Sequence, residues 1–309
     1  MSKEELDGKR IQKELISEFE KYIEENYPNN EAKNTSKAYL SDVNMFYKYF
    51  EENFSEVIIS FSRADIIEYK NHMLKEKEYK ATTINRKLAA LSVYENFLIE
   101  KEIKEVKAIK EQDFYRITVP YITAEMLPKR TIKKVKLLAG NTNIRDQVIL
   151  VFIHEGGLRV SEVINIQLER DVNLELRKIT IWGKGNRIRE IIITNAMFDV
   201  LEEYLPIRNK QLAGKENKYL IISNKSVNTG KKIDRTTVNK MLEKYCKKVN
   251  EDTINPHIFR HDFATNKYEE GYTDMMLKKT LGQTSNITDR YIHPGGEKID
   301  KILQKDKKR

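Results

Sequence analysis

The sequence predicts a mainly α-helical protein with a small β-hairpin or sheet (α+β), divided into two domains. Three observations predict this fold class. Amphipathic helical patterns follow one another through the first hundred residues, a lysine-rich polar passage covers 101–112, and beyond it helices flank a single pair of β-branched runs. A chain of 309 residues divides naturally into two domains of ordinary size. We therefore expect domains at 1–112 and 113–309, with the polar passage as a linker.

Four amphipathic segments make up the first domain. Their expected ranges are 17–27, 36–50, 64–75 and 82–100. In the last of them Leu88, Leu91 and Tyr94 recur at steps of three, which places them on one helical face. Thr82 or Thr83 is the expected N-cap of that helix. Four such helices form a small bundle with a core of its own.

The second domain is expected to combine helices with one β-hairpin. Its helices are expected at 144–155, from about 161, at 196–211, 235–249, 256–269 and 274–281, at about 287–293 and in the tail at 298–309. Two β-rich runs, 178–182 and 187–194, enclose the turn formers Gly-Lys-Gly-Asn at 183–186. This pattern predicts a hairpin with Lys184 at its tip.

The composition excludes several classes of protein. The single cysteine, Cys246, rules out a disulfide framework and a thiolate metal site within one chain. No apolar run approaches the roughly 18–20 residues that cross a bilayer, and the first residues lack a signal peptide, so we expect a soluble cytoplasmic protein with no membrane partner. A net charge of +9 and a pI near 9.2 favour nucleic-acid binding, although a solvated surface of mixed charge gives the same composition.

Two short segments contain residue types suited to phosphate chemistry. His257 and Arg260 lie one turn apart on a helix that Asn255 caps, and they combine a bidentate cation with a group that titrates near neutrality. Arg159 follows a glycine break at a helix start, where anions bind, and Glu162 is placed to hold it by a salt bridge. Taken singly, each also fits a structural role, as a partly buried histidine beside a surface arginine or as an ordinary helix start.

In their order along the chain, these segments resemble the tyrosine recombinases of the phage integrase family. The matching segments are GLRVSE at 157–162, WGKGNR at 182–187, HIFRHDFAT at 257–265, LG at 281–282, YIH at 291–293 and, in the helical N-terminal part, TINRKLAAL at 83–91. The match to the ordered set is specific, whereas each segment alone is a weak signal. The family usually has histidine or tryptophan at Gln283, whose amide donates a hydrogen bond but carries no charge.

The resemblance implies a SAM-like core-binding domain, a catalytic domain and DNA cleavage by Tyr291. The tyrosine would form a 3′-phosphotyrosyl bond and release a 5′-hydroxyl. The remaining catalytic residues would be Arg159, Lys184, His257, Arg260 and Gln283. The arginines would hold the non-bridging oxygens, the lysine would protonate the leaving oxygen, the histidine would act as general base or proton shuttle, and the glutamine would add a donor. No metal and no other cofactor is expected.

The implied partner is a double-stranded DNA recombination site that both domains would enclose as a C-shaped clamp. Arg86 and Lys87, expected on the non-apolar side of their helix, would contact it from the first domain, and a solvated helix face explains them equally well. The resemblance also implies a homo-oligomer, with a dimer on each site and a tetramer in the synapse. The tail residues Ile299, Ile302 and Leu303 would anchor a neighbouring subunit, the alternative being a frayed basic tail.

The expected function is site-specific DNA recombination, as integration, excision, or resolution of cointegrates or dimers. No further domain is expected before residue 10, which favours a simple resolvase or Xer-type enzyme of a bacterial nucleoid or plasmid over a large phage integrase. Three alternatives remain at this point. An inactive DNA-binding protein of the same fold is favoured only by Gln283, and a type IB topoisomerase would use a similar set of residues. An unrelated helical regulator would explain the charge but not the ordered segments.

Overall fold

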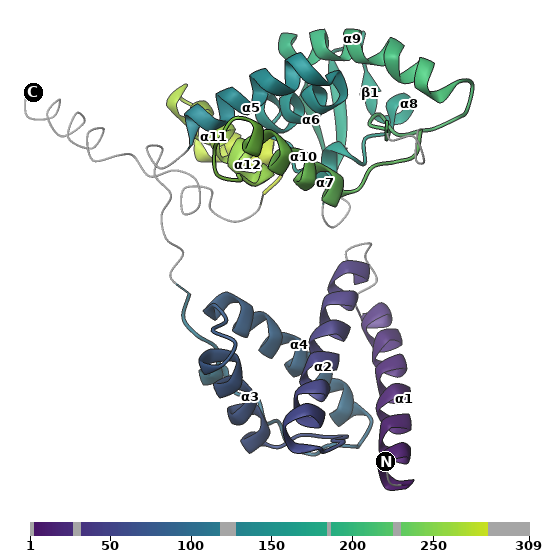
Figure 1. Ribbon diagram of the computed structural model, residues 1–309, viewed down its shortest axis with the longest axis vertical. Helices are drawn as coiled ribbons and strands as arrows, with labels where there is room; N and C mark the ends of the chain where they lie inside the picture. Colours follow the sequence, from purple (N-terminus) through teal and green to yellow (C-terminus); the bar gives the residue numbers. More distant parts are fainter. Residues whose placement is uncertain (1–2, 27–31, 118–127, 184–186, 225–229, 284–309) are drawn as a thin grey trace, which may run out of the picture. The chain divides into compact units, whose positions relative to one another are not determined.

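The structure is a computed structural model of the 309-residue chain and describes residues 3–26, 32–117, 128–183, 187–224 and 230–283 (Figure 1). It divides into two compact units, which we call the N-terminal unit (1–118) and the C-terminal unit (119–309). The described residues form helices in both units and one three-stranded sheet. The expected fold class is thereby confirmed.

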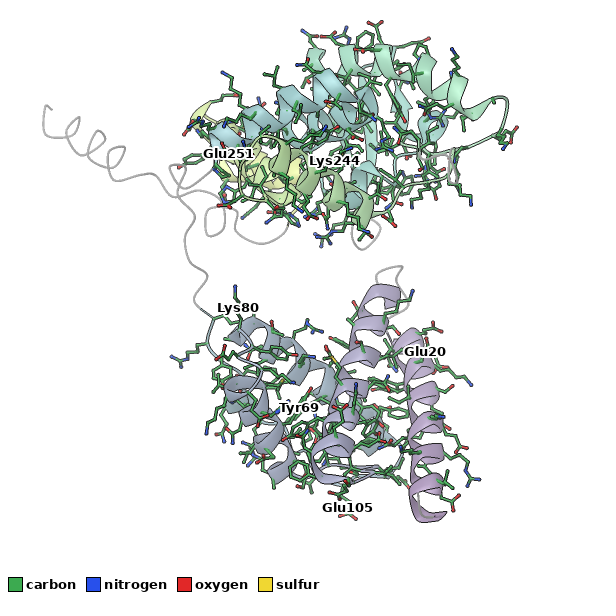
Figure 2. All side chains as sticks on the ribbon, viewed as in Figure 1. Glu20, Tyr69, Lys80, Glu105, Lys244 and Glu251 are labelled. Atoms are coloured by element: carbon green, nitrogen blue, oxygen red, sulfur yellow. The ribbon has the colours of Figure 1, made fainter. Side chains whose placement is uncertain are left out.

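All four expected helices of the N-terminal unit are present. They are α1 (Lys3–Asn26), α2 (Ala32–Phe54), α3 (Arg63–Lys75) and α4 (Ala81–Glu100). Their apolar faces enclose one core that includes Phe46, Tyr69 and Tyr94, all almost fully buried. In Figure 2, Tyr69 lies inside this unit, whereas Glu20 extends from its surface. Neither Thr82 nor Thr83 caps α4, because the helix begins one residue earlier, after Lys80.

The polar passage at 101–112 is not a free linker. Ala108 and Ile109 are buried in the core of the N-terminal unit, and their N–H groups donate to the carboxylate of Glu95 at 2.5 and 3.2 Å. A buried carboxylate thus satisfies backbone groups that burial would otherwise leave without partners. The division between the units therefore falls after Thr118 rather than after residue 112.

The C-terminal unit combines helices with a small antiparallel sheet. Its elements are α5 (Lys129–Thr142), α6 (Ile144–Glu155), α7 (Val160–Val163), α8 (Leu168–Asp171), β1 (Val172–Asn173), β2 (Lys178–Trp182), β3 (Ile188–Ile192), α9 (Asn195–Leu212), α10 (Arg235–Lys248), α11 (Pro256–Glu269) and α12 (Asp274–Leu281). Helices α5 and α8 and strand β1 were missing from the expectation. The helices expected at 287–293 and 298–309 lie outside the described residues.

Helix α6 forms the centre of the C-terminal unit. Every residue from Val148 to Ile153 is buried, and α6 packs against α5, α9 and α11 (Figure 1). It ends at Glu155, and the buried residues Gly156, Gly157 and Leu158 lead from it to α7. The expected hairpin is present, with β2 paired to β3 and Trp182 opposite Ile188. None of the described helices is long and apolar enough to cross a membrane.

Candidate active site

A small pocket in the C-terminal unit collects residues from three separate segments of the chain. Its lining comprises Leu158, Arg159, Val160 and Ser161 at the start of α7, Arg235 at the start of α10, and Pro256, His257 and Arg260 in α11. Three expected catalytic residues, Arg159, His257 and Arg260, therefore lie together. The packing of α6 against α11 and of α7 against α10 brings them into one place.

Arg159 is held by the carboxylate of Glu162. It occupies the N-cap position of α7, where its N–H donates to Glu162 Oε2 at 2.8 Å. Its guanidinium Nη1 donates to Glu162 Oε1 at 2.9 Å, which confirms the expected salt bridge. The Arg159 side chain remains 31% exposed, so this arginine is fixed at one end and still accessible to an anion.

Arg260 lies deeper, with only 1% of its surface exposed. Its guanidinium donates to the backbone carbonyls of Gly157 and Leu281, the latter at 2.6 Å. Gly157 has a φ of +61°, and a Cβ there would lie 2.5 Å from the ring of Phe263. Only glycine fits this close approach. The glycine break before α7 thus serves to bring its carbonyl against Arg260.

Arg189 on β3 was not identified from the sequence, although it belongs to the same cluster. Both of its terminal nitrogens donate to Glu162 at 2.9 Å. Burial tends to raise the pKa of Glu162, but the hydrogen bonds and charges of Arg189, together with the other arginines, lower it below its ordinary value. Glu162 is therefore ionised, and as a buried carboxylate it organises Arg159, Arg189 and Arg260, the last at 3.7 Å.

The same three arginines also donate hydrogen bonds to backbone carbonyls at the end of α12. Arg189 Nε donates to the carbonyl of Thr280 at 2.9 Å, and Arg159 and Arg260 both donate to that of Leu281. Cations stabilise a helix C-terminus, where the carbonyl groups of the last turn lack partners within the helix. This arrangement fixes the end of the helix that precedes Gln283.

Gln283 follows a left-handed turn at the end of α12. Gly282 has a φ of +60°, and a Cβ there would lie 2.7 Å from Arg189 Nη1, so the turn needs glycine. The backbone N–H of Gln283 donates to the carbonyl of Lys278 at 3.1 Å. Gln283 is not among the residues that line the pocket. Lys184 and Tyr291 lie outside the described residues.

His257 is positioned by the start of α11. The side chain of Asn255 caps the helix and accepts from the His257 N–H at 2.9 Å, as the sequence predicts. Desolvation of the ring lowers the pKa of His257 below 6.5, and the positive charges of Arg235, Arg260 and Arg159 lower it further. His257 is therefore neutral at pH 7 and able to accept a proton.

The two expected DNA contacts of the N-terminal unit have different surroundings. Arg86 is half exposed and pairs with Asp42 of α2. Lys87 is 3% exposed, and its Nζ donates to Asp42 Oδ1 at 2.9 Å. The expectation that Lys87 lies on the non-apolar side of its helix is wrong, because Lys87 is three residues from Ile84 and four from Leu91 and shares their buried face.

The residues that the structure describes contain no group of three histidine, cysteine, aspartate or glutamate side chains placed to hold a metal ion. The positive charge at the pocket comes from arginine side chains.

Comparison with known proteins places the chain in a family. The signature of the phage integrase family matches residues 127–297, and that of the phage integrase N-terminal SAM-like domain matches residues 16–102. The chain belongs to the phage integrase family. This confirms the resemblance and the enzyme class that the ordered segments predict, with the SAM-like signature over the helices of the N-terminal unit.

Several known proteins are similar to the chain over nearly its whole length. The TnP I resolvase of Bacillus thuringiensis is 27% identical over 284 residues, 91% of this chain and 95% of that protein. Tyrosine recombinase XerC of Staphylococcus carnosus is 30% identical over 284 residues, 88% of this chain and 90% of that protein. The integrase of transposon Tn1549, solved in complex with transposon right-end DNA, has a TM-score of 0.66 and 17% identity over 94% of this chain and 98% of that chain, and it shows the shared fold.

Proposed function

We propose that this chain is a site-specific DNA recombinase that cleaves and rejoins strands through a covalent bond between Tyr291 and a 3′-phosphate. The observation that carries the proposal is the convergence of Arg159, His257 and Arg260 on one pocket. A pocket with two arginines and a neutral histidine suits a phosphodiester, which is anionic and exchanges protons as it reacts.

The arginines would act on the phosphate. Transfer of a phosphoryl group spreads negative charge over its non-bridging oxygens, and cations fixed in advance stabilise that charge. Arg159 is accessible and held by Glu162, while Arg260 adds positive charge from beneath the pocket. Both positions are set by hydrogen bonds that exist before DNA arrives, so little reorganisation is needed when the substrate binds.

Proton transfers would fall to His257, Lys184 and Tyr291. The neutral imidazole of His257 accepts the phenol proton or passes it on, while Lys184, which lies between β2 and β3 in the sequence, protonates the leaving 5′-oxygen. Because phenol has an ordinary pKa of about 10, Tyr291 needs this base and the surrounding positive charge to attack. Gln283, just after the end of α12, would supply one more hydrogen-bond donor.

DNA binding would involve both units and more than one subunit. Arg86 is the candidate contact of the N-terminal unit, since its guanidinium is half exposed and Asp42 orients it. Two sites must exchange strands, so we propose a dimer on each DNA site and a tetramer in the synapse. The tail residues Ile299, Ile302 and Leu303, proposed to anchor neighbouring subunits, lie outside the described residues.

The names of the relatives indicate the type of recombination. The TnP I resolvase and Xer recombinases are similar to almost the full length of this chain, which supports exchange between two DNA sites, as in resolution of cointegrates or dimers. We place this reaction in the bacterial cytoplasm, on nucleoid or plasmid DNA. Topoisomerase-like relaxation and binding without cleavage are not favoured.

A covalent-adduct assay tests the proposal. The protein is incubated in EDTA with nicked duplexes tiled from the DNA around its gene, and the products are separated on a denaturing gel. We expect an adduct with the wild type and none with Tyr291→Phe, because the phenol oxygen forms the bond. Tyr272→Phe is the matched control, since Tyr272 lies in the same unit before α12 and is expected to keep full activity.

Three results would contradict the proposal. DNA that binds the wild type tightly without any adduct would support a binding protein of the same fold. An adduct that persists in Tyr291→Phe would assign the nucleophile to another tyrosine. Conversion of supercoiled plasmid to relaxed circles without strand exchange would support a topoisomerase.

A further inference from the structure

The pocket contains a fourth nitrogen-bearing side chain that the ordered segments do not include. Arg235, the first residue of α10, lines it together with Arg159, His257 and Arg260. Helix α10 is separate in sequence from α7 and α11, so only the packing of the C-terminal unit brings Arg235 to this position.

Arg235 differs from the other two arginines of the pocket in how its charge is balanced. Arg159 is paired with Glu162, and Arg260 is buried with its guanidinium donating to two backbone carbonyls. Arg235 is exposed and, within the described residues, its side chain has no hydrogen bond and no ion pair. Its guanidinium is therefore available to an anion that enters the pocket.

The position of Arg235 in its helix is unfavourable for stability. It follows the N-cap Asp234, whose side chain accepts from the Thr237 N–H at 2.7 Å. The start of a helix carries a partial positive charge, so carboxylates are favoured there and cations are disfavoured. Helix formation does not account for an arginine at this residue, whereas an anion in the pocket does.

The positive charge of Arg235 also lowers the pKa of His257. After desolvation, Arg235 is the largest cause of the lowered pKa of His257, ahead of Arg260 and Arg159. Like charges act on a pKa most strongly at short range. Arg235 and His257 therefore face the same small volume.

We propose that Arg235 is a phosphate-binding residue of the active site and donates to the DNA phosphate that Arg159 also binds. This inference rests on the proposed function. A phosphate has two non-bridging oxygens, and with Arg260 largely buried, Arg159 and Arg235 are the two accessible arginines that line the pocket. Each fixed donor to the developing charge accelerates phosphoryl transfer.

Single-turnover adduct formation on a cognate nicked duplex tests this inference. We compare the wild type, Arg235→Gln and Lys240→Gln at saturating DNA. Lys240 is the matched control, because it is an exposed cation on the same helix outside the pocket. We expect Arg235→Gln to slow adduct formation roughly 100-fold, the usual effect of losing one such donor, while Lys240→Gln keeps the wild-type rate.

Two further measurements separate phosphate binding from a structural role. The thermal midpoint of Arg235→Gln is expected to equal or exceed that of the wild type, since the substitution removes a cation from a helix start. The pKa of His257, followed by NMR and assigned with His257→Gln, is expected to rise in Arg235→Gln and to stay unchanged in Lys240→Gln.

Several outcomes would overturn the inference. A wild-type rate for Arg235→Gln at saturating DNA, with only weaker binding and a shallower salt dependence, would place Arg235 on a different phosphate. A slow rate with a lowered thermal midpoint would indicate a structural role. Absence of any adduct with the wild type would instead contradict the proposed function itself, so the two failures are distinguishable.

Discussion

Each unit contains a buried carboxylate that binds more than one cation, and the two clusters have different consequences. In the N-terminal unit, Asp42 on α2 pairs with Arg86 and Lys87, which are neighbours on α4. The cluster joins two helices, buries Lys87 and leaves Arg86 half exposed. Lys87 is therefore part of the core, whereas Arg86 remains accessible to a ligand.

In the C-terminal unit, Glu162 interacts with arginines from three different elements, and those arginines also donate to carbonyls at the end of α12. The cluster thus connects α7, β3, α11 and α12. The comparison teaches that a buried ion pair between two helices chiefly supports the fold, whereas one that spans several elements sets the geometry of a site. Substitution of Lys87 is therefore expected to change stability alone, whereas substitution of Glu162 is expected to change stability and catalysis together.

The largest effect is expected from Glu162→Gln. Loss of this charge leaves Arg189 and Arg260 buried without their counter-ion, which lowers the free energy of unfolding by about 3–5 kcal/mol. Without Glu162 to hold them, Arg159 and the end of α12 are positioned less precisely, and this slows adduct formation roughly 100-fold. The fluorescence of the single tryptophan, Trp182, follows unfolding of the C-terminal unit in urea, and the denaturing gel measures the adduct. Wild-type adduct formation in a folded Glu162→Gln protein would mean that Glu162 serves the fold alone.

Smaller effects are expected from substitutions of the neighbouring residues Lys87 and Arg86 on α4, the first on stability and the second on DNA binding. Lys87→Met removes the buried partner of Asp42, so it lowers the free energy of unfolding by about 2–3 kcal/mol and leaves DNA affinity unchanged. Arg86→Gln weakens DNA binding about 3- to 10-fold and lowers the salt dependence of binding by about one ion. Circular dichroism and fluorescence anisotropy measure the two properties. Equal DNA affinity for Arg86→Gln and wild type would remove Arg86 from the interface.

The smallest effect concerns His154 of α6, whose two ring nitrogens each lie 2.8 Å from a carboxylate oxygen, of Glu155 and of Asp262. Burial and nearby Lys136 lower the pKa of His154, but the hydrogen bonds to these carboxylates outweigh them and raise it above 6.5. Protonated His154 therefore stabilises the C-terminal unit fully below pH 6.5, and this contribution is lost as the pH rises through the raised pKa.

Urea unfolding monitored by Trp182 fluorescence between about pH 5 and pH 9 checks this expectation. The stability difference between wild type and His154→Gln is expected to shrink as the pH rises. Glu155, whose pKa is lowered to about 2, and Asp262, whose pKa is also lowered, stay ionised throughout this interval and add no slope of their own. A difference that is independent of pH would mean that His154 is neutral in the folded protein.

The sequence predicted those helices and strands whose ends or apolar patterns are marked by adjacent residues. Helix α11 begins where Asn255 and Pro256 indicate, since a cap and a proline at the first position depend only on adjacent residues. Helix α5 was missed because Ile132, Val135 and Ala139 are its main buried apolar residues within a lysine-rich stretch. Strand β1 has two residues and exists through its pairing with β2, which no local pattern indicates.

The sequence predicted those residues of the candidate site that lie in the ordered segments. Arg159, His257 and Arg260 are found in one pocket, whereas Lys87, expected on the non-apolar side of its helix, is buried. Arg189 was not predicted from the sequence. Isoleucine occurs on both faces of strand β3, so β3 lacks the alternation of apolar and polar residues that would mark an inward-facing arginine.

The helical character of both units, the hairpin and the ordered segments that identify the family follow directly from the amino-acid sequence, since these depend on residues close together in the chain. The tertiary structure, in contrast, sets which cation meets which anion. It placed Lys87 in the core, attached Arg189 to Glu162 and brought Arg235 beside His257. The physical reason is that the strength of an ion pair depends on burial and on distance in space, and both are set when separate elements pack.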